Sequence, residues 1–431
     1  MTDLGHLPSL CAMPPSSTAR IAVVGGGPAG LFAAETLANQ GVQVDLYDAM
    51  PSVGRKFLVA GRGGLNLTHG EAMDSFRTRY RGPDMPQTSW DQWLTDFSPQ
   101  DIRNWAAGLG IETFEASSGR VYPKEMKAAP LLRRWVDRLR GFGVRFHMRH
   151  RLCRIEHDPE LRLHFQKIAG KDKSENPLDS FYVDSPDAVI LALGGASWPI
   201  TGSDGKWTSM FDHLGIKVQP LVSANCGWEL EWPKDLLEKI EGLPLKNCRA
   251  TADGESASGE LMITRYGLEG GIIYTLGAAL RRMESPVISI DFKPTAEIDD
   301  LMRKMESVKR NILEESRTRW RLSAQVHALL EWQAELRGIQ DVAGLAALVK
   351  QFPLALQRPR PIDEAISSAG GIAWSNLTNE LSLQAAPAIF LAGEMIDWEA
   401  PTGGYLMQGC FATGRHSALS AMRFLAEKGQ S

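Results

Sequence analysis

The chain has 431 residues, of which 43% are hydrophobic, so it holds enough apolar material for a large core divided between two or three domains. Its formal net charge of −4 gives no reason to expect nucleic acid or an anionic membrane as the main partner. The five cysteines are scattered without a C-x-x-C pair, which argues against a zinc site, a redox dithiol or a disulfide framework, and we expect no metal.

The first residues of the chain do not have the pattern of a targeting signal. They are rich in proline, serine and threonine and lack the basic start and apolar run of a signal peptide. We therefore expect residues 1–19 to form a disordered tail. No apolar run in the chain reaches the roughly 18 residues that a membrane-spanning helix needs. These features predict a cytoplasmic protein without a membrane partner.

The first folded elements have the spacing of a dinucleotide-binding site. Residues 21–24 are apolar, as in a parallel strand covered on both faces, and Gly25, Gly27 and Gly30 follow with the spacing G-x-G-x-x-G. Gly25 permits a tight turn, and Gly27 lets a pyrophosphate approach the backbone. Gly30 lets the next helix, predicted over 31–40, pack close to the strand. The free N–H groups and positive dipole end of this helix favour a phosphate.

A second strand is predicted over 42–48 and ends on Asp48. At this place the dinucleotide pattern expects a carboxylate that accepts a hydrogen bond from the adenosine ribose. Asp48 would repel a 2′-phosphate, which argues against NADP in this site. NAD and FAD share the AMP half, so this motif alone does not separate them.

The stretch 54–69 is glycine-rich and carries Arg55, Lys56 and Arg62. Glycines let a backbone wrap a flat or phosphorylated ligand, and cations neutralise a pyrophosphate. Because the stretch follows the predicted ribose acid directly, we interpret it as a ligand-binding loop.

Helices and strands then alternate along the next hundred residues. We predict a helix from Pro99 behind the N-cap Ser98, a helix over 129–140, strands over 144–156 and 161–167, and a surface loop over 171–180. Arginines are frequent between 133 and 154. We interpret them as a solvated helix face followed by an edge strand, and not as a nucleic-acid patch.

Two later strands resemble the first in ending on glycine. Residues 188–193 end at Gly194, and residues 388–392 end at Gly393. Such strand ends present a ligand at the edge of a doubly wound sheet. Between them the pattern changes, which predicts an inserted β-rich domain over 206–295 and a small helical subdomain over 296–357, the latter with three helical pieces.

The C-terminal motif adds a second set of candidate ligand contacts. Glu394 follows a strand end, where its carboxylate can hydrogen-bond a ribityl hydroxyl. Gly403 and Gly404 precede a long helix predicted over 406–427, whose positive end would face the N1–C2=O edge of a flavin. A side chain at position 404 is expected to enter the space of that flavin edge.

The arrangement resembles a family of bacterial FAD-binding flavoproteins that includes bile-acid (3-dehydro-Δ4,6) reductase-like and aminoacetone-oxidase-like enzymes. The resemblance covers most of the chain from Arg20 onward and is carried by residues 25–30, 54–56, 61–68, 119–123, 192–195, 370–372, 392–394 and 403–405. It implies an α/β fold in which a discontinuous Rossmann-like FAD-binding domain, 20–205 plus 358–431, accepts the two inserted parts. It also implies that FAD is bound by Gly25, Gly27, Pro28, Ala29, Gly30, Asp48, Arg55, Lys56, Gly61, Gly63, Gly64, Asn66, Gly194, Gly393, Glu394, Gly404, Tyr405 and Leu406.

The chain departs from the common family pattern in two places. Residues 61–66 read G-R-G-G-L-N where many members have G-G-G-R-C-N, so the thiol beside the flavin is absent. Residues 264–271 replace a run of the type T-H-x-G-x-S-G. These differences mark a subgroup whose substrate need not match either named activity. A single G-x-G-x-x-G leaves no second Rossmann domain for NAD(P)H, although NADH or NADPH can serve as a transient electron donor.

The resemblance implies a FAD-dependent oxidoreductase. The leading hypothesis is a reductase of an unsaturated or carbonyl-bearing small molecule that works by hydride transfer through flavin N5. One alternative is an amine oxidase that uses O₂, and another is a flavin-dependent RNA-modifying or RNA-binding protein that uses the arginines of 133–154. Candidate catalytic residues are Arg120, Tyr122 and Lys127, with His69 as a possible proton donor.

Overall fold

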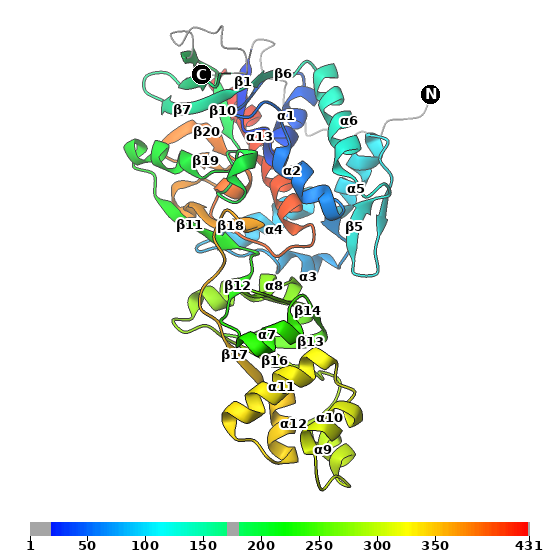
Figure 1. Ribbon diagram of the computed structural model, residues 1–431. Coiled ribbons are helices and arrows are strands. Elements are labelled where there is room, and N and C mark those ends of the chain that lie inside the picture. Colours follow the sequence, from blue (N-terminus) through cyan, green and yellow to red (C-terminus); the bar gives the residue numbers. More distant parts are fainter. Residues whose placement is uncertain (1–18, 170–180, 430–431) are drawn as a thin grey trace. The chain divides into compact units, whose positions relative to one another are not determined.

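The computed structural model describes residues 19–169 and 181–429 (Figure 1). The chain forms two compact units, of which the first contains the residues up to Val222 and those from Ser368 onward, and the second contains Ser223–Ser367. The predicted disordered tail, up to residue 18, and the predicted loop 171–180 lie outside the described residues. Within the described ranges, no helix is both long and apolar enough to cross a bilayer.

The first unit is built on a six-stranded sheet that is parallel except at one edge. Its strand order is β19 (Ser382–Leu383), β20 (Ala386–Leu391), β10 (Ala188–Leu191), β1 (Arg20–Val24), β2 (Gln43–Asp48) and β6 (Arg145–Met148). All neighbours run parallel except β19, which pairs antiparallel with β20. The apolar residues of β1 are buried, and Val24 stands in register with Leu191 and Tyr47. The ends of β1, β2, β10 and β20 therefore meet at one edge, as the sequence predicts.

The first unit also contains several α-helices. They are α1 (Pro28–Asn39), α2 (Arg55–Ala60), α3 (Met73–Arg77), α4 (Gln87–Asp96), α5 (Pro99–Gly108), α6 (Ala128–Gly141) and α13 (Tyr405–Lys428). The first and last of them, α1 and α13, pack against each other and share one hydrophobic core. Ser98 and Asp101 form a capping box at the start of α5, so this predicted helix start is confirmed.

The first unit also contains two three-stranded antiparallel sheets. One contains β3 (Thr68–His69), β5 (Arg120–Pro123) and β4 (Thr113–Glu115), and the other β7 (His150–Glu156), β8 (Arg162–Lys167) and β9 (Phe181–Asp184). The single strand predicted over 144–156 is wrong, because Arg149 has a left-handed φ of 61°. The break lets β6 join the parallel sheet while β7 begins the antiparallel one.

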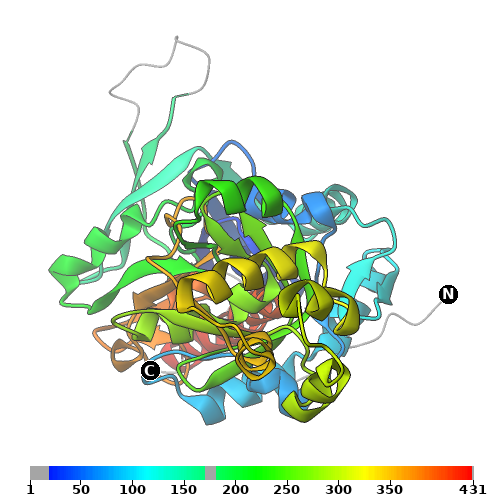
Figure 2. The same ribbon diagram turned by 60° about the horizontal axis from the view of Figure 1, so that its bottom comes forward.

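The second unit combines strands and helices around one core. Its sheet has the order β12 (Trp228–Glu229), β15 (Gly267–Glu269), β14 (Glu255–Thr264), β13 (Pro244–Ala252), β16 (Val287–Asp291) and β17 (Phe352–Ala355). Its helices are α7 (Lys234–Ile240), α8 (Gly271–Arg282), α9 (Ile298–Met305), α10 (Ile312–Arg319), α11 (Ala324–Arg337) and α12 (Val342–Lys350). Figure 2 shows the helices of this unit, in green and yellow, in a second view.

The structure corrects the predicted boundaries of the insertion. Residues 206–222 belong to the first unit, where Trp207 and Phe211 are buried in a core with strands β1 and β10. The stretch 296–357 has four helices and not three, and it shares a hydrophobic core with the strands of the second unit. It is therefore not a separate subdomain. The chain leaves the first unit within β11 (Val218–Ala224) and returns within β18 (Ser367–Ile372), two strands that pair with each other.

Candidate cofactor site

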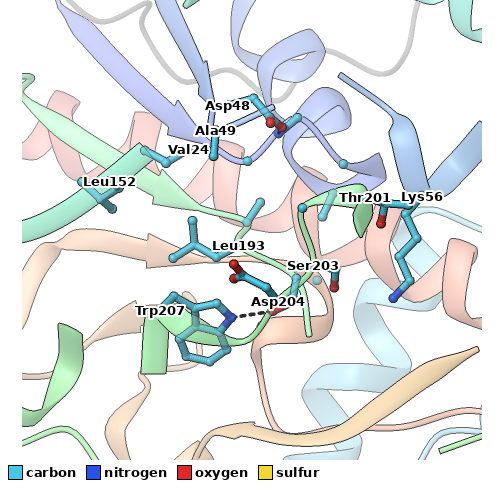
Figure 3. A pocket seen from close by; sticks show the side chains of 18 of the residues that line it. Val24, Asp48, Ala49, Lys56, Leu152, Leu193, Thr201, Ser203, Asp204 and Trp207 are labelled. Atoms are coloured by element: carbon cyan, nitrogen blue, oxygen red, sulfur yellow. Dashed lines mark hydrogen bonds between the residues drawn. The ribbon is translucent and has the colours of Figure 1, made fainter. Parts of the chain in front are cut away.

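A cavity of about 370 Å³ opens where the parallel strands of the first unit end (Figure 3). The turn after β1, the end of β2 and the segments that follow β10 and β20 form its walls. The predicted cofactor residues that line it are Gly25, Gly27, Pro28, Ala29, Asp48, Arg55, Lys56, Gly194, Gly393 and Glu394. Segments far apart in the sequence thus meet at one site.

The three glycines of the phosphate motif differ in what surrounds them. Gly25 has a φ of 109°, and a side chain there would overlap the carbonyl of Ala192. A Cβ at Gly27 would meet no atom within 4 Å, so this backbone is open to a ligand. A Cβ at Gly30 would overlap the Gly25 carbonyl, which explains the close approach of α1 to the strand. These environments agree with the predicted roles: Gly25 forms the tight turn, Gly27 leaves its backbone open to a phosphate, and Gly30 lets the helix pack closely.

Asp48 organises the turn as well as facing the cavity. One carboxylate oxygen accepts a hydrogen bond from the Gly26 N–H at 2.7 Å, and the other accepts from the Met50 N–H at 2.7 Å. Burial raises the pKa of the carboxyl, although these two N–H groups and the charge of Arg55 oppose the rise. The carboxylate retains lone pairs for a ribose hydroxyl.

Lys56 and Glu394, predicted separately, form an ion pair with a distance of 2.9 Å. Lys56 also donates to the Ser197 hydroxyl at 2.6 Å, and the second Glu394 oxygen accepts from the Ser368 N–H at 2.9 Å. Both serines are almost fully buried. Each member of the pair thus has a second hydrogen-bond partner, and the Glu394 carboxylate is fixed where β20 ends.

Buried polar atoms without a partner test whether the site fits a dinucleotide. Among the described residues, Arg55 Nε, Ser203 Oγ and Asn66 Oδ1 are buried and make no hydrogen bond. Arg55 and Ser203 line the cavity. Buried polar atoms are normally hydrogen-bonded, so unpaired atoms beside an open glycine turn are what a site for a phosphate-bearing ligand requires. The residues fit FAD in this respect.

The glycine-rich stretch is not an open loop. It forms α2 and a short 3-10 turn over Gly61–Gly63. Gly61 packs on Ala128, and Gly64 faces Met126 and Tyr122. None of Gly61, Gly63, Gly64 and Asn66 lines the cavity.

Leu65 stands where many relatives have cysteine. It is 1% exposed and belongs to the hydrophobic core. A side chain at this position points into the protein. The replacement of cysteine by leucine therefore alters the packing of the hydrophobic core.

The start of α13 packs on β3 and does not line the cavity. Gly404 has a φ of 98°, and a Cβ there would lie 2.5 Å from backbone atoms of Thr68. The expectation that such a side chain would enter the flavin space is therefore wrong. The Tyr405 hydroxyl donates to Glu71 at 2.6 Å, so this ring is held within the protein. Leu406 likewise lies outside the cavity lining.

His69 is not a free proton donor. Its Nδ1 accepts from the Glu71 N–H at 3.1 Å, and its Nε2 lies 3.0 Å from the Ser118 carbonyl. Because a carbonyl can only accept, Nε2 carries the hydrogen, and both ring nitrogens are engaged. The ring stacks on Tyr405 with centroids 5.2 Å apart. The His69 ring is therefore held by the backbone of residues 71 and 118 and by Tyr405.

Arg120 and Tyr122 lie on one face of β5, because side chains of a strand alternate and Val121 between them is fully buried. The Tyr122 ring lies 3.5 Å from the Cβ position of Gly64. Both side chains are half-buried, whereas Lys127 is exposed at the start of α6. The strand thus presents two of the candidate residues, and not Lys127, as neighbours on the same face.

Most arginines of the segment 133–154 are engaged within the protein. Arg138 pairs with Glu35, Arg145 with Asp45, Arg151 with Asp204, and Arg154 with Glu156. Arg134 donates to the carbonyls of Leu109 and Gly110. These contacts agree with the interpretation of the segment as structural.

Part of the cavity wall was missed by sequence reasoning. It consists of His150–Cys153 at the start of β7 and of residues between Thr201 and Met210. The indole N–H of Trp207 donates to the Gly194 carbonyl at 2.9 Å and holds the second segment beside the glycine turn. The only sequence signal was Gly202 and Gly205, both with left-handed φ values, just beyond the Gly194 turn.

Comparison with known proteins agrees with this geometry. The chain is 25% identical to the 3-dehydro-bile acid delta(4,6)-reductase of Clostridium scindens, over 92% of this chain and 97% of that protein. It is 21% identical to the ribosomal RNA dihydrouridine synthase of Haemophilus influenzae, over 93% and 98%. The solved structure of the 3-ketosteroid-delta4-(5alpha)-dehydrogenase of Rhodococcus jostii RHA1 is similar in fold, with a TM-score of 0.50 and 15% identity over 95% of this chain and 100% of that one.

The parallel sheet, the glycine turn and the cavity with its unpaired polar atoms define a dinucleotide-binding protein of the Rossmann class. The model of the HI0933-like protein Rossmann domain matches residues 19–420. The chain belongs to this HI0933-like family, and it is a FAD-dependent oxidoreductase. The resemblance inferred from the sequence is confirmed.

Proposed function

We propose that the protein is a reductase that adds hydrogen across a carbon–carbon double bond conjugated to a carbonyl group in a small molecule. NADH or NADPH would be the transient electron donor. The observation that carries the proposal is the face of β5, where Arg120 and Tyr122 lie side by side next to Gly64, in the segment expected to hold the flavin half. Neither side chain makes a hydrogen bond or ion pair with another described residue.

These two residues match the needs of such a reduction. Bound FAD supplies a hydride carrier. The hydride adds to the carbon β to the carbonyl, which leaves negative charge on the carbonyl oxygen and requires a proton at the α-carbon. The Arg120 guanidinium would donate to the carbonyl oxygen, and the Tyr122 hydroxyl would supply the proton.

The name of the Clostridium scindens relative supports this substrate class. A 3-dehydro-bile acid with double bonds at positions 4 and 6 has a ketone conjugated to those double bonds. We therefore expect a planar, apolar enone as the substrate, without assigning a particular steroid.

A second candidate is reduction of a uracil base in RNA. It is favoured by the names of two relatives, both ribosomal RNA dihydrouridine synthases, which match over 93% and 91% of this chain. The engagement of the arginines in segment 133–154 weakens an RNA-binding role for that segment. The two candidates share the reduction of a carbonyl-conjugated double bond and differ in the size of the substrate.

The test is to follow the two half-reactions separately without O₂. The purified protein is first reduced with NADH or NADPH, and the reduced flavin is then mixed with 4-androstene-3,17-dione as an enone probe. Reoxidation of the flavin with a product two mass units heavier is the expected result. Reoxidation only by uridine-containing RNA would support the second candidate, and rapid turnover of amines with O₂ alone would overturn both.

Variants then test the two residues. We expect Tyr122→Phe and Arg120→Ala to slow flavin reoxidation by the enone roughly 10²-fold or more, the usual contribution of a positioned acid or donor. Reduction by NAD(P)H should stay unchanged. Lys124→Ala is the control, because Lys124 is exposed and pairs with Glu112, which is also exposed. Equal rates for wild type and both variants would contradict the assignment.

A further inference from the structure

We propose that Ser203 binds the pyrophosphate of the dinucleotide, together with Arg55, from the cavity-lining segment that follows Gly194. Ser203 is outside the dinucleotide fingerprint and lies in the segment that sequence reasoning missed. The inference rests on the FAD-binding part of the proposed function and not on the identity of the substrate.

The state of the Ser203 side chain is the first observation. The residue is 8% exposed, its Oγ is buried, and this oxygen has no hydrogen-bond partner among the described residues. The residue lines the cavity, and Figure 3 shows it with Asp204 across the pocket from Asp48 and Ala49. A buried hydroxyl without a partner is unfavourable unless a ligand completes it.

The backbone around Ser203 is held in place. Gly202 has a φ of 104°, and a Cβ there would lie 2.7 Å from the Met50 side chain. On the other side, Asp204 pairs with Arg151 at 3.3 Å, and the Trp207 indole is bonded to Gly194. The segment is thus tied to the ends of β2, β7 and β10. Its unpaired hydroxyl is a fixed feature of the cavity wall.

The charges in the cavity indicate what the hydroxyl would meet. Lys56 is paired with Glu394, and Arg151 and Lys206 are both paired with Asp204. Arg55 also lines the cavity, and its buried Nε has no hydrogen-bond partner among the described residues. An arginine with an unpaired N–H is suited to a phosphate oxygen.

A diphosphate satisfies these groups together. The Arg55 N–H and the Ser203 O–H are both donors, and the open backbone of Gly27 precedes the twelve-residue helix α1. A diphosphate has oxygen acceptors that point in several directions, and its negative charge complements the Arg55 guanidinium. A ribose hydroxyl or an adenine ring offers fewer acceptors and no charge, so we assign the pair to the pyrophosphate.

The experiment compares ADP with adenosine as ligands of the protein after removal of FAD. For Ser203→Ala we expect about tenfold weaker ADP binding, as for a lost hydrogen bond to a charged group, with adenosine binding unchanged. FAD should dissociate faster by a similar factor. Ser185→Ala, an exposed serine that does not line the cavity, is the matched control and should bind both ligands as wild type does.

Thermal unfolding separates this role from a structural one. Because the hydroxyl is unpaired, Ser203→Ala should leave the ligand-free protein as stable as wild type or more stable, and lower the gain in stability that FAD provides. Wild-type affinity for ADP, equal losses for ADP and adenosine, or a destabilised ligand-free variant would each overturn the assignment. Failure of enone reduction with this binding pattern intact would contradict only the proposed substrate.

Discussion

Asp48 shows how a single side chain joins local structure to ligand binding. Its two oxygens accept from the N–H groups of Gly26 and Met50, so the carboxylate shapes the glycine turn that borders the cavity. The sequence predicted only a ribose contact. The structure adds that removal of this side chain would also leave the N–H groups of Gly26 and Met50 without their acceptor.

We therefore expect different results for two substitutions of Asp48. Asp48→Asn keeps one acceptor and should weaken FAD binding by roughly 1–3 kcal/mol while the ligand-free protein still folds. Asp48→Ala should weaken FAD to at least that extent and also lower the melting temperature without ligand. Isothermal titration and thermal unfolding measure the two effects, with exposed Asp212→Asn as the control. Unchanged FAD affinity in both variants would show that Asp48 does not bind the ribose.

Asp397 gives a prediction about pH. Burial raises the pKa of its carboxyl to about 6, against a hydrogen bond from the Gly370 N–H that lowers it. An unfolded aspartate has a pKa of about 3.9. The folded protein therefore binds the proton more tightly, and stability should rise as the pH falls from about 6 to about 4. Above pH 6 the buried, ionised carboxylate is unfavourable.

Asp397→Asn should remove this dependence, because the amide carries no charge at any pH and can still accept from Gly370. We expect the variant to be more stable than wild type at pH 8 by roughly 1–3 kcal/mol, with the difference disappearing near pH 4. Denaturant unfolding at a series of pH values measures this. Exposed Asp363→Asn is the control, and a constant difference across the series would contradict the prediction.

At the scale of elements, the start of α13 depends on a close contact with β3. Gly404 lacks room for a Cβ beside the Thr68 backbone and has a left-handed φ, so both sterics and conformation require glycine. Gly404→Ala should lower stability by about 2–4 kcal/mol. Gly429→Ala, at the other end of the same helix with a φ of −75°, should be neutral or slightly stabilising. Similar melting temperatures for the two variants would show that the Thr68 backbone can move to make room for a Cβ at position 404.

The elements differ in how far the sequence predicts them. The first strand, helix and second strand are adjacent in the chain and carry their own signals, an apolar run, three spaced glycines and a terminal acid, so the prediction holds. The stretch 144–156 has strand character throughout, and only the left-handed backbone of Arg149 divides it between two sheets. Such a break depends on which sheet each half joins, and that information lies outside the segment.

At the scale of the whole molecule, the two units have separate hydrophobic cores. One core contains Ile272, Leu329 and Phe352 of the second unit, and the other cores lie in the first unit. The cofactor cavity is lined only by residues of the first unit among those that the structure describes.

FAD should therefore stabilise the two units unequally. A ligand stabilises the folded state that binds it by mass action. We expect removal of FAD to lower the melting transition of the first unit and to leave amide exchange in β13 and β14 of the second unit unchanged. Calorimetry and hydrogen exchange with and without FAD measure this. An equal loss of protection in both units would show that they unfold as one.

The sequence by itself determined the class of the protein. The strand, glycine turn and acid are contiguous, and a phosphate-binding turn depends on local backbone freedom and a helix end, both of which a short stretch specifies. The same reasoning selected Lys56 and Glu394, which both line the cavity, although it did not show that they pair.

Only the tertiary structure decided which polar groups remain free for a ligand. Ser203 has no sequence signal, and its role follows from burial without a partner in a wall formed by segments about two hundred residues apart. His69 and Tyr405 have plausible sequence signals, yet their polar atoms are engaged by Glu71 and Ser118. Whether a side chain binds a ligand depends on what else lies within hydrogen-bonding distance, and in this chain those partners come from distant segments that only the folded structure brings together.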